Sequence, residues 1–79
     1  MLVSVLASGS KGNSTYIKTK NHEILIDAGC TMTYLNEKLI ENNTNLDNID
    51  YIFITHTHSD HVSSIKNIIK KYSPTLILT

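Results

Sequence analysis

The sequence has no arginine and no tryptophan, and its 79 residues include only one proline and one cysteine. All seven cations are lysines and seven acids balance them, so the formal net charge is zero. This argues against bulk electrostatic binding of nucleic acid, although a phosphate-bearing substrate stays compatible because a bound metal ion brings its own charge. The single cysteine, Cys30, cannot form a disulfide within the chain, which excludes a disulfide-stapled mini-protein and favours a reducing cytoplasm.

Long apolar runs are also lacking. None approaches the roughly 20 residues that span a bilayer, so we expect a cytoplasmic protein without a membrane segment. With 41% hydrophobic and 18% charged residues, the composition is that of a globular chain rather than a disordered one. A chain of 79 residues forms at most one domain, and at this size a metal, a partner chain or further sequence is needed for ample stability.

Five short apolar segments, separated by glycine and polar residues, predict strands at residues 2–6, 14–18, 23–27, 51–55 and 75–79. The fourth, YIFIT, is apolar throughout and is expected to be buried on both faces. Two stretches show helical spacing, and their apolar positions are Met32, Leu35, Leu39 and Ile40, then Val62, Ile65, Ile68, Ile69 and Tyr72. The predicted fold is therefore α/β, in the order β-β-β-α-β-α-β. It opens as an antiparallel meander and closes as a βαβ unit with a parallel strand pair.

Directly after the fourth predicted strand, the stretch HTHSDH at residues 56–61 brings together three histidines and a carboxylate. Imidazole nitrogens and carboxylate oxygens are ligands of Zn²⁺ and its first-row neighbours. His56 and His58 are two residues apart and point the same way in an extended chain, while Asp60 and His61 follow after a turn. The stretch predicts metal binding, with two ligands for each of two ions about 3.5–4 Å apart.

A second polar stretch, SGSKGN at residues 8–13, joins the first two predicted strands. Its backbone N–H groups can cradle a phosphate, with Lys11 adding a positive charge. It is not a Walker A loop, because Asn13 follows Gly12 where that pattern requires lysine. The alternative is a polar loop in which glycine permits a positive φ.

Four other side chains are given structural interpretations. Cys30 is expected to be a small, buried or half-buried side chain rather than a ligand or nucleophile. Tyr34 and Tyr51 are interpreted as packing residues rather than stacking platforms. His22 lies in a predicted turn and is expected to be exposed.

Three motifs together resemble one known family. HTHSDH after a hydrophobic strand resembles the HxHxDH signature of the metallo-β-lactamase fold hydrolases, and IDAG at residues 26–29 resembles the aspartate-bearing motif that precedes it. SGSKGN resembles the opening of a branch that contains exonuclease-like and other phosphodiesterase members. The resemblance implies the N-terminal part of an αββα sandwich, so residues 1–79 are expected to form a single, incomplete domain.

The resemblance also implies roles for individual residues. His56 and His58 would ligate the first of two divalent ions, zinc or manganese, and Asp60 and His61 the second. Asp60 would in addition handle a proton as the catalytic residue. Asp27 would hold the metal loop through hydrogen bonds. Contacts to the substrate are expected from Ser10, Lys11 and Asn13.

The implied function is a metal-dependent hydrolase, a phosphodiesterase or nuclease acting on nucleic acid or a small nucleotide through a metal-activated water. The family's other ligands, a third histidine, a bridging aspartate and a late histidine, have no counterpart in these residues. We therefore expect the full-length context to be an enzyme and the 79-residue chain alone to be inactive.

Three alternatives stay open. The chain is a truncated or split, non-catalytic fragment that needs a partner, either a second copy or a missing C-terminal piece, because the apolar segment at 75–79 needs neighbours. A second alternative is that the chain belongs to a cyclic-nucleotide phosphodiesterase of the same fold. Or it is a one-metal binding module that uses His56, His58 and a borrowed ligand.

Overall fold

The computed structural model describes residues 1–9, 12–55 and 59–78, with the backbone alone at 59–64 and 78. The described residues form a mixed α/β structure in the order β-β-β-α-β-α-β, which confirms the predicted order and fold class. The strands are β1 (Leu2–Ala7), β2 (Ser14–Lys18), β3 (Glu23–Ile26), β4 (Tyr51–Ile54) and β5 (Thr75–Leu78). The helices are α1 (Met32–Glu41), the short 3-10 helix η1 (Leu46–Asn48) and α2 (Ser59–Tyr72). In this part of the chain, no helix has the length and apolar character needed to cross a membrane.

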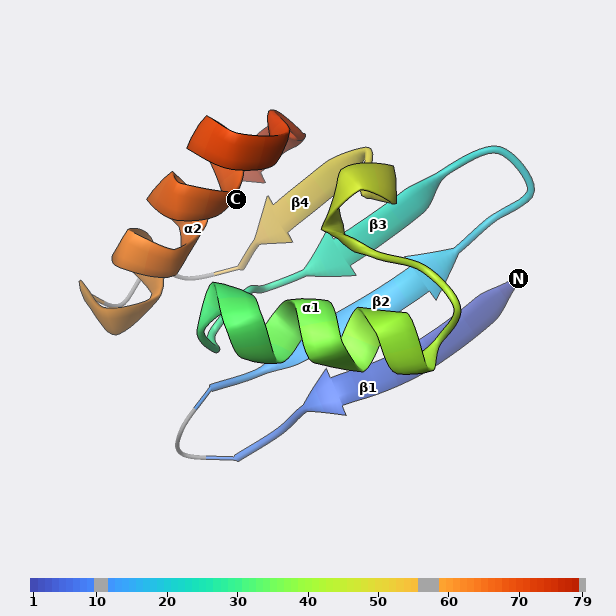
Figure 1. The fold of residues 1–79 in the computed structure, drawn as a ribbon, viewed down its shortest axis with the longest axis horizontal. Helices are drawn as coiled ribbons and strands as arrows, with labels where there is room; N and C mark the ends of the chain where they lie inside the picture. Colours follow the sequence, from blue (N-terminus) through green and yellow to red (C-terminus); the bar gives the residue numbers. More distant parts are fainter. Residues whose placement is uncertain (10–11, 56–58, 79) are drawn as a thin grey trace.

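The strands form one sheet in the order β1-β2-β3-β4-β5 (Figure 1). β1 with β2 and β2 with β3 pair antiparallel, whereas β3 with β4 and β4 with β5 pair parallel, as the sequence predicts. Parallel neighbours need a crossover connection, and α1 and α2 provide the two crossovers. The C-terminal ends of β3 and β4 therefore lie side by side at one edge of the sheet.

Helix α1 begins at a side-chain cap and turns one apolar face to the sheet. The Thr31 hydroxyl accepts a hydrogen bond from the Tyr34 backbone N–H at 3.2 Å, which satisfies one of the free donors of the first turn. Leu35 and Leu39 are fully buried. Ile40, predicted on the same stripe, is 58% exposed. The prediction is wrong because Ile40 lies about 100° around the helix from Leu39, beyond the face that meets the sheet.

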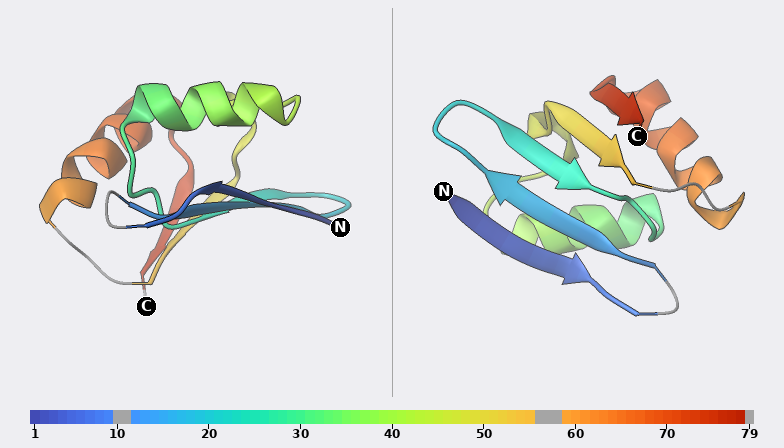
Figure 2. Two further views of the ribbon diagram at one scale, coloured as in Figure 1. Left: turned by 90° about the horizontal axis from the view of Figure 1, so that it is seen from below. Right: turned by 180° about the vertical axis from the view of Figure 1, so that it is seen from behind.

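The core lies between the two helices and one face of the sheet. Figure 2 shows both helices on that side. Alternate residues of the central strands point into it, and the fully buried side chains there include Tyr16, Leu25, Ile52, Leu35, Leu39 and Ile68.

The opposite face of the sheet carries no helix or strand among the described residues, as the view from behind shows (Figure 2). Neighbouring residues in the strand register share this open sheet face, which comprises Val3, Val5, Ile17, Ile24, Ile26, Tyr51, Phe53 and Ile77, together with Thr15 and Thr75. Val5 is 66% exposed there. β4 was expected to be buried on both faces, but Tyr51 and Phe53 are only partly buried. The prediction is wrong for this structure because, within the described part of the chain, the helices cover only one side of β4.

Candidate metal centre

Three segments meet at the sheet edge where β3 and β4 end. Residues 27–30 follow β3, Thr55 follows β4, and residues 8–13 connect β1 to β2. The Gly29 backbone N–H donates to the Asn13 carbonyl oxygen at 3.0 Å, which ties two of these segments together. In open α/β sheets, ligands bind outside the carboxyl ends of strands, so this edge is the natural position for a site.

Asp27 joins its own segment to Thr55, the residue that follows β4. Its carboxylate accepts hydrogen bonds from the Thr55 backbone N–H at 2.9 Å and from the Thr55 hydroxyl at 2.7 Å. Its own backbone N–H donates to the Phe53 carbonyl oxygen at 2.7 Å. Asp27 has a φ of 62°, a conformation that aspartate adopts more readily than most residues. The end of β4, which leads into HTHSDH, is thus held by both the backbone and the side chain of Asp27.

The predicted metal ligands follow this contact. Asp60 and His61 lie in the first turn of α2, where the structure describes the backbone but not the side chains. Among the described residues, no three histidine, cysteine, aspartate or glutamate side chains are grouped closely enough to hold a metal ion. Four predicted site residues lie outside the described residues: His56, His58, Ser10 and Lys11.

The described part of SGSKGN is bonded to itself and to the neighbouring turn. The Asn13 side-chain oxygen accepts from the Gly9 backbone N–H at 3.2 Å. Gly12 has a φ of 136°, and a Cβ placed on it would overlap the Gly29 carbonyl oxygen. Glycine is therefore required at position 12 both for its conformation and for the close approach of two backbones. Substrate contact by Asn13 stays a prediction. In the structure, its side chain and its carbonyl oxygen accept hydrogen bonds that hold the loop, from Gly9 and Gly29.

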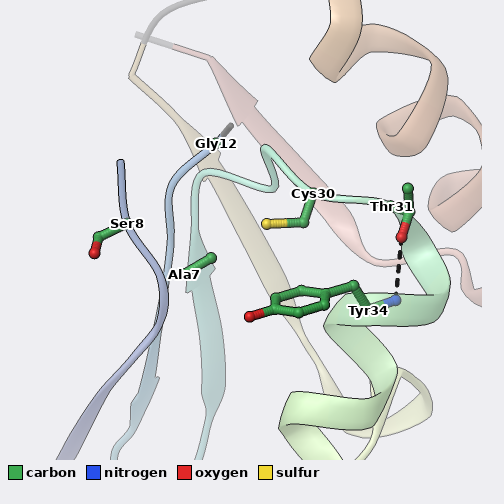
Figure 3. Close-up of a pocket in the computed structure, with 6 residues that line it drawn as sticks. All are labelled: Ala7, Ser8, Gly12, Cys30, Thr31 and Tyr34. Carbon is green, nitrogen blue, oxygen red and sulfur yellow. Dashed lines mark hydrogen bonds between the residues drawn. The ribbon is translucent and has the colours of Figure 1, made fainter. Parts of the chain in front are cut away.

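A cavity of about 420 Å³ opens beside this edge, between the end of β1 and the beginning of α1 (Figure 3). The Cys30 and Tyr34 side chains both project toward it, from the segment before α1 and from its first turn. Cys30 is half-buried, as predicted, and burial raises the pKa of its thiol. Tyr34 is 39% exposed, which differs from the packing role predicted for it. The other described residues that line it are Ala7, Ser8, Gly12 and Thr31.

The opposite edge holds a different polar cluster. The Tyr16 hydroxyl donates to Glu23 Oε1 at 2.6 Å, and the Thr44 hydroxyl donates to the same oxygen. Burial, together with the hydrogen bond and charge of Glu23, raises the pKa of Tyr16 to about 12. His22, at this edge, has a side chain that is 53% exposed, which confirms its predicted exposure. These groups lie at the start of β3 and stabilise the fold away from the candidate site.

Solved structures share this arrangement. Rm3 metallo-beta-lactamase superimposes with a TM-score of 0.73 at 15% identity, over 94% of this chain and 28% of that one. BJP-1, a subclass B3 metallo-beta-lactamase of Bradyrhizobium japonicum, superimposes with a TM-score of 0.69 at 25% identity, over 82% of this chain and 25% of that one. The fold is therefore that of the metallo-beta-lactamases.

Sequence comparison assigns the family. The metallo-beta-lactamase superfamily model matches residues 7–78, and the chain belongs to this superfamily. Over 69 residues the chain is 42% identical to the exodeoxyribonuclease WalJ of Streptococcus pneumoniae, covering 87% of this chain and 26% of that protein. With the same coverage it is 36% identical to the exodeoxyribonuclease YycJ of Bacillus anthracis. The chain thus spans about a quarter of the length of these relatives.

Proposed function

We propose that this chain is part of a cytoplasmic, metal-dependent phosphodiesterase that cleaves nucleic acid, with DNA ends as its substrate. Membership of the superfamily supports the hydrolase class, and the two relatives described as exodeoxyribonucleases support the substrate. The single observation that carries the proposal is the contact between Asp27 and Thr55, because it fixes the chain directly before the histidine-rich stretch.

The donor set fits a pair of divalent ions, zinc or manganese. Imidazole suits zinc, and carboxylate with imidazole also accepts manganese. We propose that His56 and His58 hold one ion and that Asp60 and His61 hold the other. When bound, such ions supply Lewis-acid stabilisation of the phosphoryl oxygens and lower the pKa of water.

The chain's own residues would position the reacting groups and move a proton. Asp27 orients the end of β4 at Thr55, the residue directly before His56 in the sequence. The Asp60 carboxylate would accept a proton from the attacking water or return one to the leaving oxygen, which general acid–base catalysis requires. The Asn13–Gly29 hydrogen bond steadies the segment that carries Asp27.

We further propose that residues outside these 79 complete the site and cover the open sheet face. The relatives are about four times as long as the matched segment. The open sheet face is mostly apolar, with eight of its ten residues hydrophobic, and such a face is normally buried against another layer. A further sheet layer of the same protein is the occupant that the relatives' length favours, and it would also bring the metal ligands that these residues lack.

The proposal is tested on the complete protein with two histidine variants. His58→Ala removes a proposed ligand, whereas His22→Ala removes an exposed histidine at the opposite edge and serves as the matched control. We expect His58→Ala to lower the metal content, measured by elemental analysis. We also expect it to slow nucleotide release from end-labelled DNA by more than about 100-fold, because losing a ligand should cost at least as much as losing its supporting partner.

Two results would contradict this function. Equal activity of the His58→Ala and His22→Ala variants would exclude the assigned metal centre. Hydrolysis of cyclic nucleotides without any cleavage of DNA would exclude the nucleic-acid substrate while leaving the metal centre in place.

A further inference from the structure

The cavity between β1 and α1 has the size and position of a ligand pocket. Its volume of about 420 Å³ falls within the roughly 300–1,000 Å³ of small-molecule sites. It lies at the same sheet edge as the Asp27–Thr55 contact, because Cys30 follows Asp27 by three residues. Within residues 1–9, 12–55 and 65–77, whose side chains the structure describes, no residue that lines it is a proposed metal ligand.

We propose that this cavity binds a nucleobase of the substrate, stacked on the ring of Tyr34. The inference rests on the proposed function, since the substrate is taken to be nucleic acid. It names a base-binding subsite that includes Tyr34 and Cys30, which are not proposed metal ligands.

The side chain of Tyr34 supplies the stacking surface. Figure 3 shows its ring along one side of the cavity, with Cys30 Sγ beside it and Ala7 across from it. The hydrogen bond from the Tyr34 N–H to Thr31 fixes the backbone that carries the ring. Lys38 Nζ lies over the ring, 5.5 Å from its centroid, and such a cation–π contact restricts the ring's motion. A positioned aromatic ring that is 39% exposed is the kind of platform on which bases stack.

The remaining wall suits a flat, uncharged ring with polar edges. Ala7 and Cys30 offer apolar contacts, and burial raises the pKa of the Cys30 thiol. The Tyr34 hydroxyl lies on the β1 side of its ring (Figure 3), and a hydroxyl both donates and accepts hydrogen bonds. A base presents donors and acceptors on its edge and π-faces above and below, so this mixture matches it.

The cavity is also built on fixed backbone. Gly12, which lines it, packs so closely on Gly29 that a Cβ has no room. The Gly29–Asn13 hydrogen bond holds the same two segments together. A pocket whose walls are held in this way loses little conformational freedom when a ligand enters, which favours binding.

The test measures binding without metal, so that it does not depend on catalysis. The complete protein in EDTA is dialysed to equilibrium against 2′-deoxyadenosine 5′-monophosphate and, separately, against 2-deoxyribose 5-phosphate, which lacks the base. We expect the nucleotide to bind at least tenfold more tightly than the sugar phosphate. Stacking of a base on an aromatic ring contributes about 1–3 kcal/mol, so Tyr34→Ala should weaken nucleotide binding by about fivefold to hundredfold.

Two variants provide the controls. Tyr34→Phe keeps the ring and should bind within about threefold of the wild type, because stacking needs the ring and not the hydroxyl. Ile40→Ala shortens another exposed side chain of α1 and should not change binding. If Tyr34→Ala does not fold, the test uses the NMR chemical shifts of backbone amides in the unsubstituted protein. Adding nucleotide should change the amide shifts of Cys30, Thr31 and Tyr34.

The inference is overturned if Tyr34→Ala binds the nucleotide as tightly as the wild type, if the sugar phosphate binds equally well, or if the amide shifts occur away from the cavity. Failure of the proposed function gives a different result. In that case Tyr34-dependent nucleotide binding persists in EDTA, while the metal-loaded protein cleaves no phosphodiester.

Discussion

Asp27 and Thr55 are joined by two hydrogen bonds between one carboxylate and one residue's backbone N–H and hydroxyl, at 2.9 and 2.7 Å. Because the Asp27 N–H also donates to Phe53, the two strand ends are linked at three points within a few residues. This arrangement fixes the direction in which the chain leaves β4. We therefore expect the proposed metal centre to be sensitive to Asp27 even without direct contact.

Replacement of Asp27 by asparagine should weaken that support. The two Thr55 groups donate to different Asp27 oxygens, and the amide replaces one of these oxygens with an NH₂ donor, so one of the two groups loses the acceptor that it uses. We expect metal affinity of the complete protein to fall about 10- to 100-fold. Competition with a chelator measures this affinity. Asp47→Asn, at an exposed acid in η1, is the matched control, and equal affinities of the two variants would refute the positioning role.

Gly12 should tolerate alanine much less well than Gly9. Both glycines have a positive φ, 136° and 113°, but only at Gly12 would a Cβ meet backbone atoms, those of Gly29. An unfavourable φ alone costs about 1–3 kcal/mol. Gly9→Ala should lower the free energy of unfolding by an amount within that range, and Gly12→Ala should lower it by more. Denaturant unfolding of both variants gives the comparison, and similar losses would show that the loop does not need its close approach to Gly29.

The buried Tyr16 should make the protein sensitive to alkali. Its pKa is raised from 10.0 to about 12, first by burial and then by Glu23, so the folded state favours the protonated phenol. The resulting stabilisation is fully present below pH 10 and is lost as the pH rises through about 12.

Unfolding free energies measured from pH 9 to 12 check this expectation. The stability advantage of the wild type over Tyr16→Phe should shrink across the upper part of that range. Tyr34→Phe, at an exposed tyrosine, should follow the wild type. A constant difference between wild type and Tyr16→Phe would contradict the shifted titration.

The open sheet face should be buried in the complete protein. Val5→Lys places a charge on this face, at a residue that is 66% exposed here, and Ile40→Lys places one on the outer side of α1 at a residue that is 58% exposed. A charge on an exposed surface changes stability by about 0.5 kcal/mol or less, whereas a buried, unpaired charge costs several kcal/mol. Thermal unfolding of the complete protein should show a large loss of stability for Val5→Lys and not for Ile40→Lys. Equal and small effects would mean that no layer covers the face.

Much of the fold was predictable because each element has a local signal. Glycine and polar residues bound the five apolar segments, and the 3.6-residue spacing marks α1. The exposure of Ile40 was not predictable, because two adjacent apolar residues on a helix both fit a broad stripe. The partial exposure of Tyr51 and Phe53 was not predictable either, because an apolar strand does not reveal how many layers cover it.

The candidate site was predictable in its chemistry but not in its supports. Spacing alone indicated metal ligands at 56–61, and the resemblance named Asp27. The bonding partner of Asp27 lies 28 residues away, and only the parallel pairing of β3 with β4 reveals it. The cavity combines residues from three segments of the chain, so no single stretch of sequence marked Tyr34. Its position in the first turn of a helix that begins beside the IDAG motif was the one available signal.

The distance in sequence between Asp27 and Thr55 also bears on the order of folding. Their contact closes a loop that contains all of α1 and η1, and such long-range contacts form only after the intervening chain has been brought together. Before β3 and β4 pair, the three histidines of HTHSDH belong to a chain with no fixed direction. The proposed metal centre would therefore be one of the last features to be organised, and the ions would be acquired by a folded protein rather than by the growing chain.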